Sequence, residues 1–155
     1  MSKFYDKHWK MQNPTTTPLN VLLVDDNARD ALLTQYALTD IQIPHNLKIT
    51  NSVQDGLSIV FDTKKQRPHF SPDLILLDLW MPVRKGTEML KAIKAHKTAK
   101  HIPTVIISTS NAPNDREICR KLNADGYIVK DVDFLTFIEN MQSLWMILGE
   151  KLPTP

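Results

Sequence analysis

The stretch DLILLD, residues 73–78, decides the fold class: a short apolar run that ends in an aspartate. Such a run is typical of a strand that is buried on both faces of a parallel sheet. Two other runs share this character, LNVLLV at 19–24 and IPTVIIST at 102–109. Weaker patterns predict two shorter strands, LKIT at 47–50 and GYIVK at 126–130. The sequence therefore predicts five strands.

Amphipathic segments separate these strands and follow the last one. Their apolar residues recur at three- and four-residue spacing, which predicts helices over residues 27–40, 53–63, 87–97, 113–123 and 133–148. Strands that alternate with helices favour an α/β fold, in which helices cover both faces of a parallel sheet.

The predicted strands and helices occupy residues 19–148, which is the size of one domain. Residues 1–18 end in PTTTP and predict an N-terminal extension, and residues 149–155 predict a C-terminal tail. Because so short a tail has no room for an effector domain, we expect the output to pass through a partner or through self-association.

The composition excludes several classes of function. Lysine and arginine number 19 against 17 acidic residues, a net charge of +2 without a dense basic run, so we expect no nucleic-acid partner. No apolar run approaches the about 20 residues of a membrane span, and the N-terminus lacks a secretion signal, so we expect a cytoplasmic protein without membrane contact. The lone Cys119 excludes an intrachain disulfide, and the five histidines lack metal-ligand spacing.

Polar residues stand where four of the predicted strands end. Asp25 and Asp26 follow the first strand, Asp78 closes the third, Ser108 lies at the end of the fourth, and Lys130 at the end of the fifth. A single aspartate in such a place is usually a helix cap or a turn former. Four coincident strand ends instead favour a site, because α/β folds bind ligands at the carboxyl edge of the sheet.

The charges indicate the chemistry of this site. Three carboxylates in a half-buried cleft repel one another, and Lys130 compensates one of them. A hard divalent cation such as Mg²⁺, which binds carboxylates, phosphate oxygens and water, would compensate the rest. The sequence has no Walker-type glycine loop and no Ser/His/Asp or Cys/His arrangement. These residues favour a carboxylate nucleophile that accepts a phosphoryl group.

The blocks VLLVDDN, LILLDLWMPVRKG, IISTS and GYIVK together resemble the successive motifs of bacterial response-regulator receiver domains. The resemblance covers about residues 19–148 and implies a flavodoxin-like, doubly wound five-stranded parallel sheet in the order 2-1-3-4-5 with five helices. It also implies a phosphoacceptor rather than an enzyme in the ordinary sense, one that catalyses its own phosphorylation and slow dephosphorylation.

The resemblance assigns roles to the residues at the predicted site. Asp78 matches the phosphoacceptor, and Lys130 matches the lysine that pairs with the phosphoryl group. Asp25, Asp26, Asp78 and the main-chain carbonyl of Trp80 match the ligands of Mg²⁺.

Two further residues match the switch of the family. Ser108 matches the hydroxyl that moves toward the phosphoryl group, and Tyr127 matches the aromatic that swings inward with it. Pro82 and Gly86 match the turn of the acceptor loop. The family transmits its signal through the surface of the fourth helix, fifth strand and fifth helix.

The chain departs from the family pattern at three positions. Asp131 stands after Lys130, where the family commonly has proline. Trp80 lies two residues after the acceptor, and Ser110 lies two residues after Ser108, at positions that influence the loss of the phosphoryl group. Because Trp80 can shield an acyl phosphate and Ser110 has no carboxylate to orient water, we expect slow autodephosphorylation.

Two alternatives remain open. One is a receiver-like scaffold that binds partners without phosphorylation, which the intact set of site residues disfavours. The other is a phosphohydrolase with an aspartate nucleophile, which needs a second acid two residues after that nucleophile, where this chain has Trp80.

The resemblance implies a sensor histidine kinase as partner. The acceptor loop, the lysine without a following proline, and the segment SLWMILGEKLP are similar to stand-alone regulators that partner phytochrome-type kinases. In the predicted last helix, Phe137, Leu144 and Ile147 widen the apolar arc. They either complete the core or form an exposed patch that pairs two copies of the chain.

Overall fold

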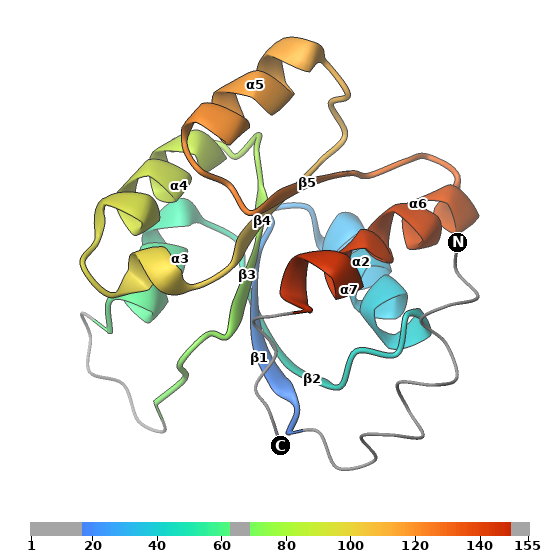
Figure 1. Cartoon of the computed structure of the whole chain (residues 1–155), viewed down its shortest axis with the longest axis horizontal. Coiled ribbons are helices and arrows are strands. Elements are labelled where there is room, and N and C mark those ends of the chain that lie inside the picture. The colour runs from blue at the N-terminus through green and yellow to red at the C-terminus, as the bar shows by residue number, and fades with distance from the viewer. Residues whose placement is uncertain (1–16, 63–68, 150–155) are drawn as a thin grey trace.

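The computed structural model describes residues 17–62 and 69–149. Five parallel strands form one sheet in the order β2-β1-β3-β4-β5 (Figure 1). They are β1 (Leu19–Val24), β2 (His45–Thr50), β3 (Leu74–Asp78), β4 (Thr104–Ser108) and β5 (Gly126–Val129). The predicted flavodoxin-like strand order is confirmed.

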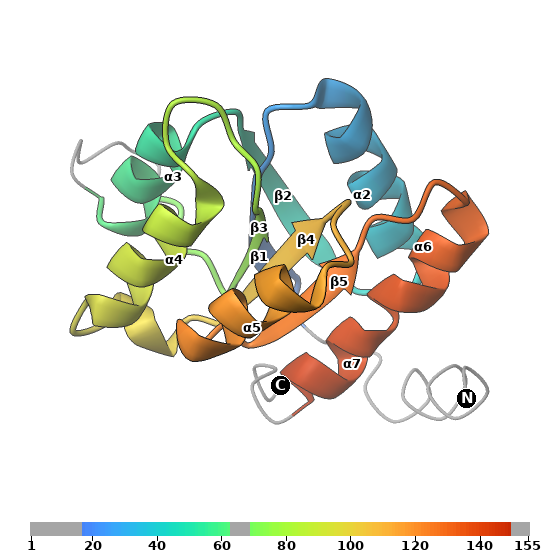
Figure 2. The same cartoon turned by 90° about the horizontal axis from the view of Figure 1, so that it is seen from above.

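Helices cover both faces of this sheet, as the views in Figures 1 and 2 show. One face carries α2 (Ala28–Asp40), α6 (Phe134–Met141) and α7 (Ser143–Leu148). The other carries α3 (Val53–Val60), α4 (Gly86–Ala95), α5 (Pro113–Lys121) and the short 3-10 helix η2 (Ala99–His101).

The apolar runs of the strands supply both layers of the core. In β1, Leu19, Val21 and Leu23 face the α2 side, whereas Leu22 and Val24 face the α3 side. Successive side chains of a strand point to opposite faces, so a sheet covered on both faces needs apolar residues throughout. The same requirement produces the LILL of β3, in which every residue is fully buried.

The predicted last helix is divided in two. Helix α6 ends at Met141, and α7 begins at Ser143. The Ser143 hydroxyl donates a hydrogen bond of 2.8 Å to the carbonyl of Asn140, so a side chain competes there with the regular helical bonding pattern. The indole of Trp145 donates to the carbonyl of Ile41 at 2.9 Å and holds α7 against the end of α2.

The wider apolar arc of these helices belongs mainly to the core. Phe137 and Leu144 are 3% and 0% exposed, and Ile147 packs against the same cluster. These residues therefore do not form the exposed patch that the sequence left open as a way to pair two copies. The large apolar side chains that α6 and α7 expose are instead Leu135 and Met146.

The predicted extension (1–18) and tail (149–155) lie outside the described residues except for Thr17, Pro18 and Gly149. The predicted domain bounds stay a prediction for that reason. Within the described part of the chain, none of the helices has the length and apolar character needed to cross a membrane.

The burial of α7 predicts a contrast between two neighbouring residues. Leu144→Ala removes a fully buried side chain and should lower the free energy of unfolding by about 2–5 kcal/mol. Met146→Ala, on the exposed side of the same helix, should change it by less than about 0.5 kcal/mol. Urea denaturation measures both, and equal losses would contradict the assignment of Leu144 to the core.

Candidate functional site

The carboxyl ends of β1, β3 and β5 bring one lysine and several carboxylates together. The Lys130 ammonium lies 2.8 Å from Asp25 Oδ2 and 3.4 Å from Asp78 Oδ2. It also lies 3.2 Å from Asp30 Oδ2, on the first turn of α2. Lys130, Asp25 and Asp78 are all buried. The predicted convergence of strand ends is thus present, and Asp30 joins it as a residue that sequence reasoning missed.

Three carboxylates of this edge form a candidate metal site. Asp25, Asp26 and Asp78 each offer an oxygen, and these oxygens lie within 4.8 Å of one another. Asp26 is exposed, so one side of the cluster faces solvent. Oxygen ligands with an open side fit Mg²⁺, which binds through few carboxylates and keeps several waters. The main-chain carbonyl of Trp80 as a further ligand stays a prediction.

The surroundings of Asp78 shift its protonation. Burial, together with the negative charge of Asp25, raises the pKa of Asp78 to about 6, although Lys130 and the Trp80 N–H partly oppose this. For Lys130, burial lowers the pKa, but the carboxylates of Asp78, Asp25 and Asp30 outweigh burial and raise it above the usual value. Lys130 is thus held in its charged form, whereas burial makes the negative charge of the Asp78 carboxylate unfavourable.

Trp80 stands beside the carboxylate of Asp78. Its main-chain N–H donates to Asp78 Oδ1 at 3.3 Å, and its side chain is 52% exposed. The Lys85 ammonium lies 5.7 Å from the centre of the Trp80 ring, a distance at which the cation attracts the ring face. The loop after β3 therefore presents a large aromatic and a positive charge next to the candidate acceptor.

The same loop is tightly constrained at two points. A Cβ at Gly86 would overlap the main-chain oxygen of Asp78, so only glycine allows α4 to begin so close to β3. Val83 has a φ of 68°, and the N–H of Arg84 bonds to the carbonyl of Pro82 at 2.8 Å across it. A β-branched residue in this left-handed region is strained, and Val83 is fully exposed.

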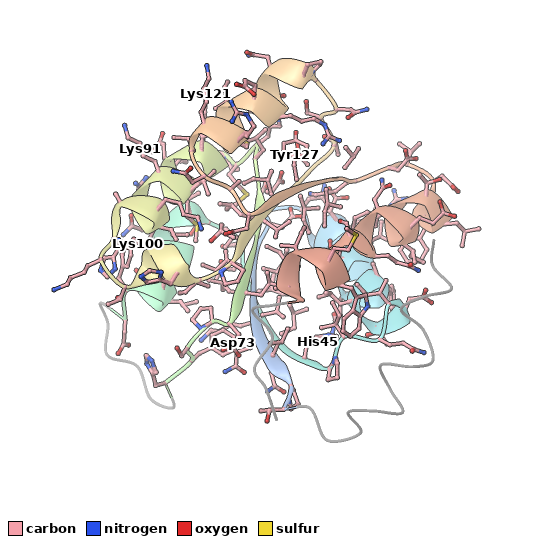
Figure 3. All side chains as sticks on the ribbon, viewed as in Figure 1. His45, Asp73, Lys91, Lys100, Lys121 and Tyr127 are labelled. Atoms are coloured by element: carbon pink, nitrogen blue, oxygen red, sulfur yellow. The ribbon has the colours of Figure 1, made fainter. Side chains whose placement is uncertain are left out.

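The two predicted switch residues contact the same loop residue. Ser108 is fully buried at the end of β4, and its hydroxyl accepts a hydrogen bond of 3.1 Å from the N–H of Ser110. The Tyr127 hydroxyl donates to the carbonyl of Ser110 at 2.9 Å. The ring of Tyr127 lies between β5 and α5 (Figure 3).

Comparison with known proteins now identifies the fold. Residues 21–142 match the response regulator receiver domain. The chain belongs to this family. This receiver domain is 31% identical over 142 residues to the response regulator Rcp1 of Synechocystis sp., a match that covers 88% of this chain and 95% of that protein.

Solved structures agree with this assignment. The phosphorylated cyanobacterial phytochrome response regulator RcpA matches with a TM-score of 0.78 and 28% identity, over 90% of this chain and 99% of that one. The Mn(2+)-bound form of Rcp1 matches with a TM-score of 0.76 and 28% identity, over 89% of this chain and 99% of that one. The protein is therefore a receiver-domain response regulator of two-component signal transduction rather than a conventional enzyme.

The raised pKa of Asp78 predicts a gain in stability on neutralisation. With metal removed by EDTA, Asp78→Asn should increase the free energy of unfolding at about pH 7 by about 1–3 kcal/mol, because a neutral amide replaces a buried charge. The folded protein binds the Asp78 proton more tightly than the unfolded chain. The free energy of unfolding of the wild type therefore falls as the pH rises through the range between about 4 and about 6, because Asp78 loses its proton there.

Urea denaturation at several pH values tests this expectation. The difference between the variant and the wild type should narrow as the pH falls from about 7 to about 5. Asp131→Asn, at an exposed position, is the control and should follow the wild type throughout. A gain in stability for Asp78→Asn that is independent of pH would contradict the prediction.

Proposed function

We propose that this receiver domain accepts a phosphoryl group on Asp78 from the phosphohistidine of a sensor histidine kinase. The observation that carries the proposal is the Lys130 ammonium, 2.8 Å from Asp25 and 3.4 Å from Asp78, beside a cluster of three carboxylates. In the reaction an oxygen of Asp78 bonds to phosphorus as the phosphorus–nitrogen bond of the donor breaks. The electron pair of that bond stays on the histidine nitrogen, and because the other ring nitrogen of the phosphohistidine carries a proton, the products are an acyl phosphate and a neutral histidine.

The residues of the chain supply orientation and charge for this transfer. Burial removes much of the water from Asp78, and Lys130 is held in its charged form near the incoming phosphoryl oxygens. Mg²⁺ held by Asp25, Asp26 and Asp78 would neutralise further negative charge on the phosphoryl group. Asp30 shares the ammonium of Lys130 and so keeps that side chain extended across the site.

The acyl phosphate is expected to be lost slowly. Trp80 places an aromatic beside the acceptor, and the Ser110 hydroxyl is engaged as a donor to the carboxylate of Asp115 on the first turn of α5. Neither side chain offers a carboxylate to orient an attacking water. A slow loss also separates this proposal from phosphohydrolase activity, which requires repeated turnover.

The phosphoryl group is proposed to act through Ser108 and Tyr127 on the surface of the fourth helix (α5), the fifth strand (β5) and the fifth helix (α6). Phosphorylation adds acceptor oxygens that attract the Ser108 hydroxyl and the Lys130 ammonium.

The resemblance to Rcp1 and RcpA supports a phytochrome-type kinase as the donor. Self-association through α6 and α7 stays a prediction, and the exposed Leu135 and Met146 are the apolar residues available for it.

A small phosphodonor separates the proposal from its alternatives. Incubation with acetyl phosphate and Mg²⁺ should label the wild type to about one phosphoryl group per chain. Intact-protein mass spectrometry measures the label. Asp78→Asn should remove the label, and EDTA should suppress labelling of the wild type. Asp131→Asn is the matched control and should label normally. No label on the wild type would instead support a phosphorylation-independent scaffold, and rapid repeated turnover a phosphohydrolase.

The position of Trp80 predicts the rate at which the label is lost. Trp80→Asn removes the aromatic shield and adds a polar amide, and should accelerate dephosphorylation by up to about tenfold, a barrier change of about 1.4 kcal/mol. Val83→Asn makes a matched change at an exposed position of the same loop and should leave the rate within about twofold. Timed decay of the labelled protein measures both rates, and an unchanged rate in Trp80→Asn would contradict the shielding role.

A further inference from the structure

The loop between β4 and α5 is fastened to the first turns of α5. The Ser110 hydroxyl donates to the carboxylate of Asp115 and accepts from the N–H of Ala112 at 3.2 Å. The side-chain oxygen of Asn111 accepts two hydrogen bonds from the Arg116 guanidinium, at 3.1 and 3.0 Å. Side-chain hydrogen bonds therefore join the loop to the start of α5.

Arg116 extends this connection to β5. The centre of its guanidinium lies 4.7 Å from the centre of the Tyr127 ring, so the cation stacks on the ring face. The hydroxyl of that tyrosine bonds back to the carbonyl of Ser110. The contacts form a closed cycle from Ser110 and Asn111 through Arg116 to Tyr127 and back to Ser110. Tyr127 can leave its place between β5 and α5 only by breaking contacts at both its face and its hydroxyl.

The charge of Arg116 has no other evident use in the described part of the chain. The neighbouring acids are bonded elsewhere, Asp115 to Ser110 and Glu117 to Arg120. The polar contacts of Arg116 within residues 17–62 and 69–149 are the amide oxygen of Asn111 and the ring of Tyr127. These contacts orient the guanidinium over the ring, which favours a positioning role over an ion pair.

We propose that the observed place of Tyr127, with its hydroxyl on the carbonyl of Ser110, is the inward position, and that Arg116 is a positioning residue that holds it there before phosphorylation. Arg116 would thereby lower the free energy that phosphorylation of Asp78 must supply to switch the output surface. The inference rests on the proposed roles of Asp78 and Tyr127. When the Ser108 hydroxyl leaves the N–H of Ser110 for the phosphoryl group, the closed cycle of contacts makes the loop, α5 and Tyr127 respond as one unit.

The position of Tyr127 in the unphosphorylated protein is tested first. The chain contains three tyrosines, and ¹³C labelling of their rings gives signals of which Tyr127 is assigned with Tyr127→Phe. In Arg116→Gln the Tyr127 signal should show exchange broadening on the microsecond-to-millisecond scale that the wild type lacks. Arg116→Lys, which keeps a cation, should partly restore the sharp signal. Arg120→Gln is the control, because Arg120 lies on the same helix and pairs with Glu117.

The link to phosphorylation is tested with beryllofluoride, a mimic of the phosphoryl group, in the presence of Mg²⁺. Binding is followed by the change in tryptophan fluorescence, to which Trp80 contributes as the tryptophan beside the acceptor among the three of the chain. Because free energies of coupling are reciprocal, Arg116→Gln should weaken beryllofluoride binding about two- to fivefold, the range expected from loss of one cation–π contact. Arg120→Gln should bind as the wild type does, and urea denaturation should find both variants folded.

The two measurements separate this inference from the proposed function. A wild type that does not bind beryllofluoride would contradict the proposed role of Asp78, while the Tyr127 signal of the free protein would still decide the role of Arg116. A Tyr127 signal in Arg116→Gln without exchange would overturn the inference. Weakened beryllofluoride binding of the same size in Arg120→Gln would also overturn it, because the effect would then follow the loss of any positive charge on α5.

Discussion

The ion pair between Lys130 and the buried carboxylates of Asp25 and Asp78 is the interaction on which the rest of the site depends. A carboxylate removed from water is costly unless a positive charge compensates it. Because β4 lies between β3 and β5, Lys130 has to reach Asp78 past the end of β4, where the small Ser108 stands. The strand order therefore places a small residue at the end of β4, between the strand ends that carry the lysine and the acceptor.

The strands and the strand-end residues could be predicted because each has a local physical signature. A strand covered on both faces must be apolar throughout, and the polar residue that follows it marks the functional edge. Asp30 and Arg116 could not be found in this way. Their roles come from packing: Asp30 meets Lys130, which is distant in sequence, and Arg116 meets Tyr127 across the gap between a helix and a strand.

The end of the chain shows a second limit of sequence reasoning. Helical spacing indicates that 133–148 is apolar on a broad arc, but it does not tell which parts of the arc a neighbour covers. The position of α7 against α2 decides that Leu144 is buried. At the break between α6 and α7 the Ser143 hydroxyl bonds to the main-chain carbonyl of Asn140, a bond that serine makes in some helices and not in others.

The acceptor loop combines one contact that only glycine permits with solvent-accessible positions. Gly86 touches the main chain of Asp78, so side-chain bulk there would displace the acceptor itself, whereas Trp80 is half-exposed and Val83 is fully exposed. A protein engineer could therefore diversify the middle of this loop while leaving its closing glycine untouched. Under the proposed function, changes in the middle of this loop would alter the lifetime of the acyl phosphate without a redesign of the core.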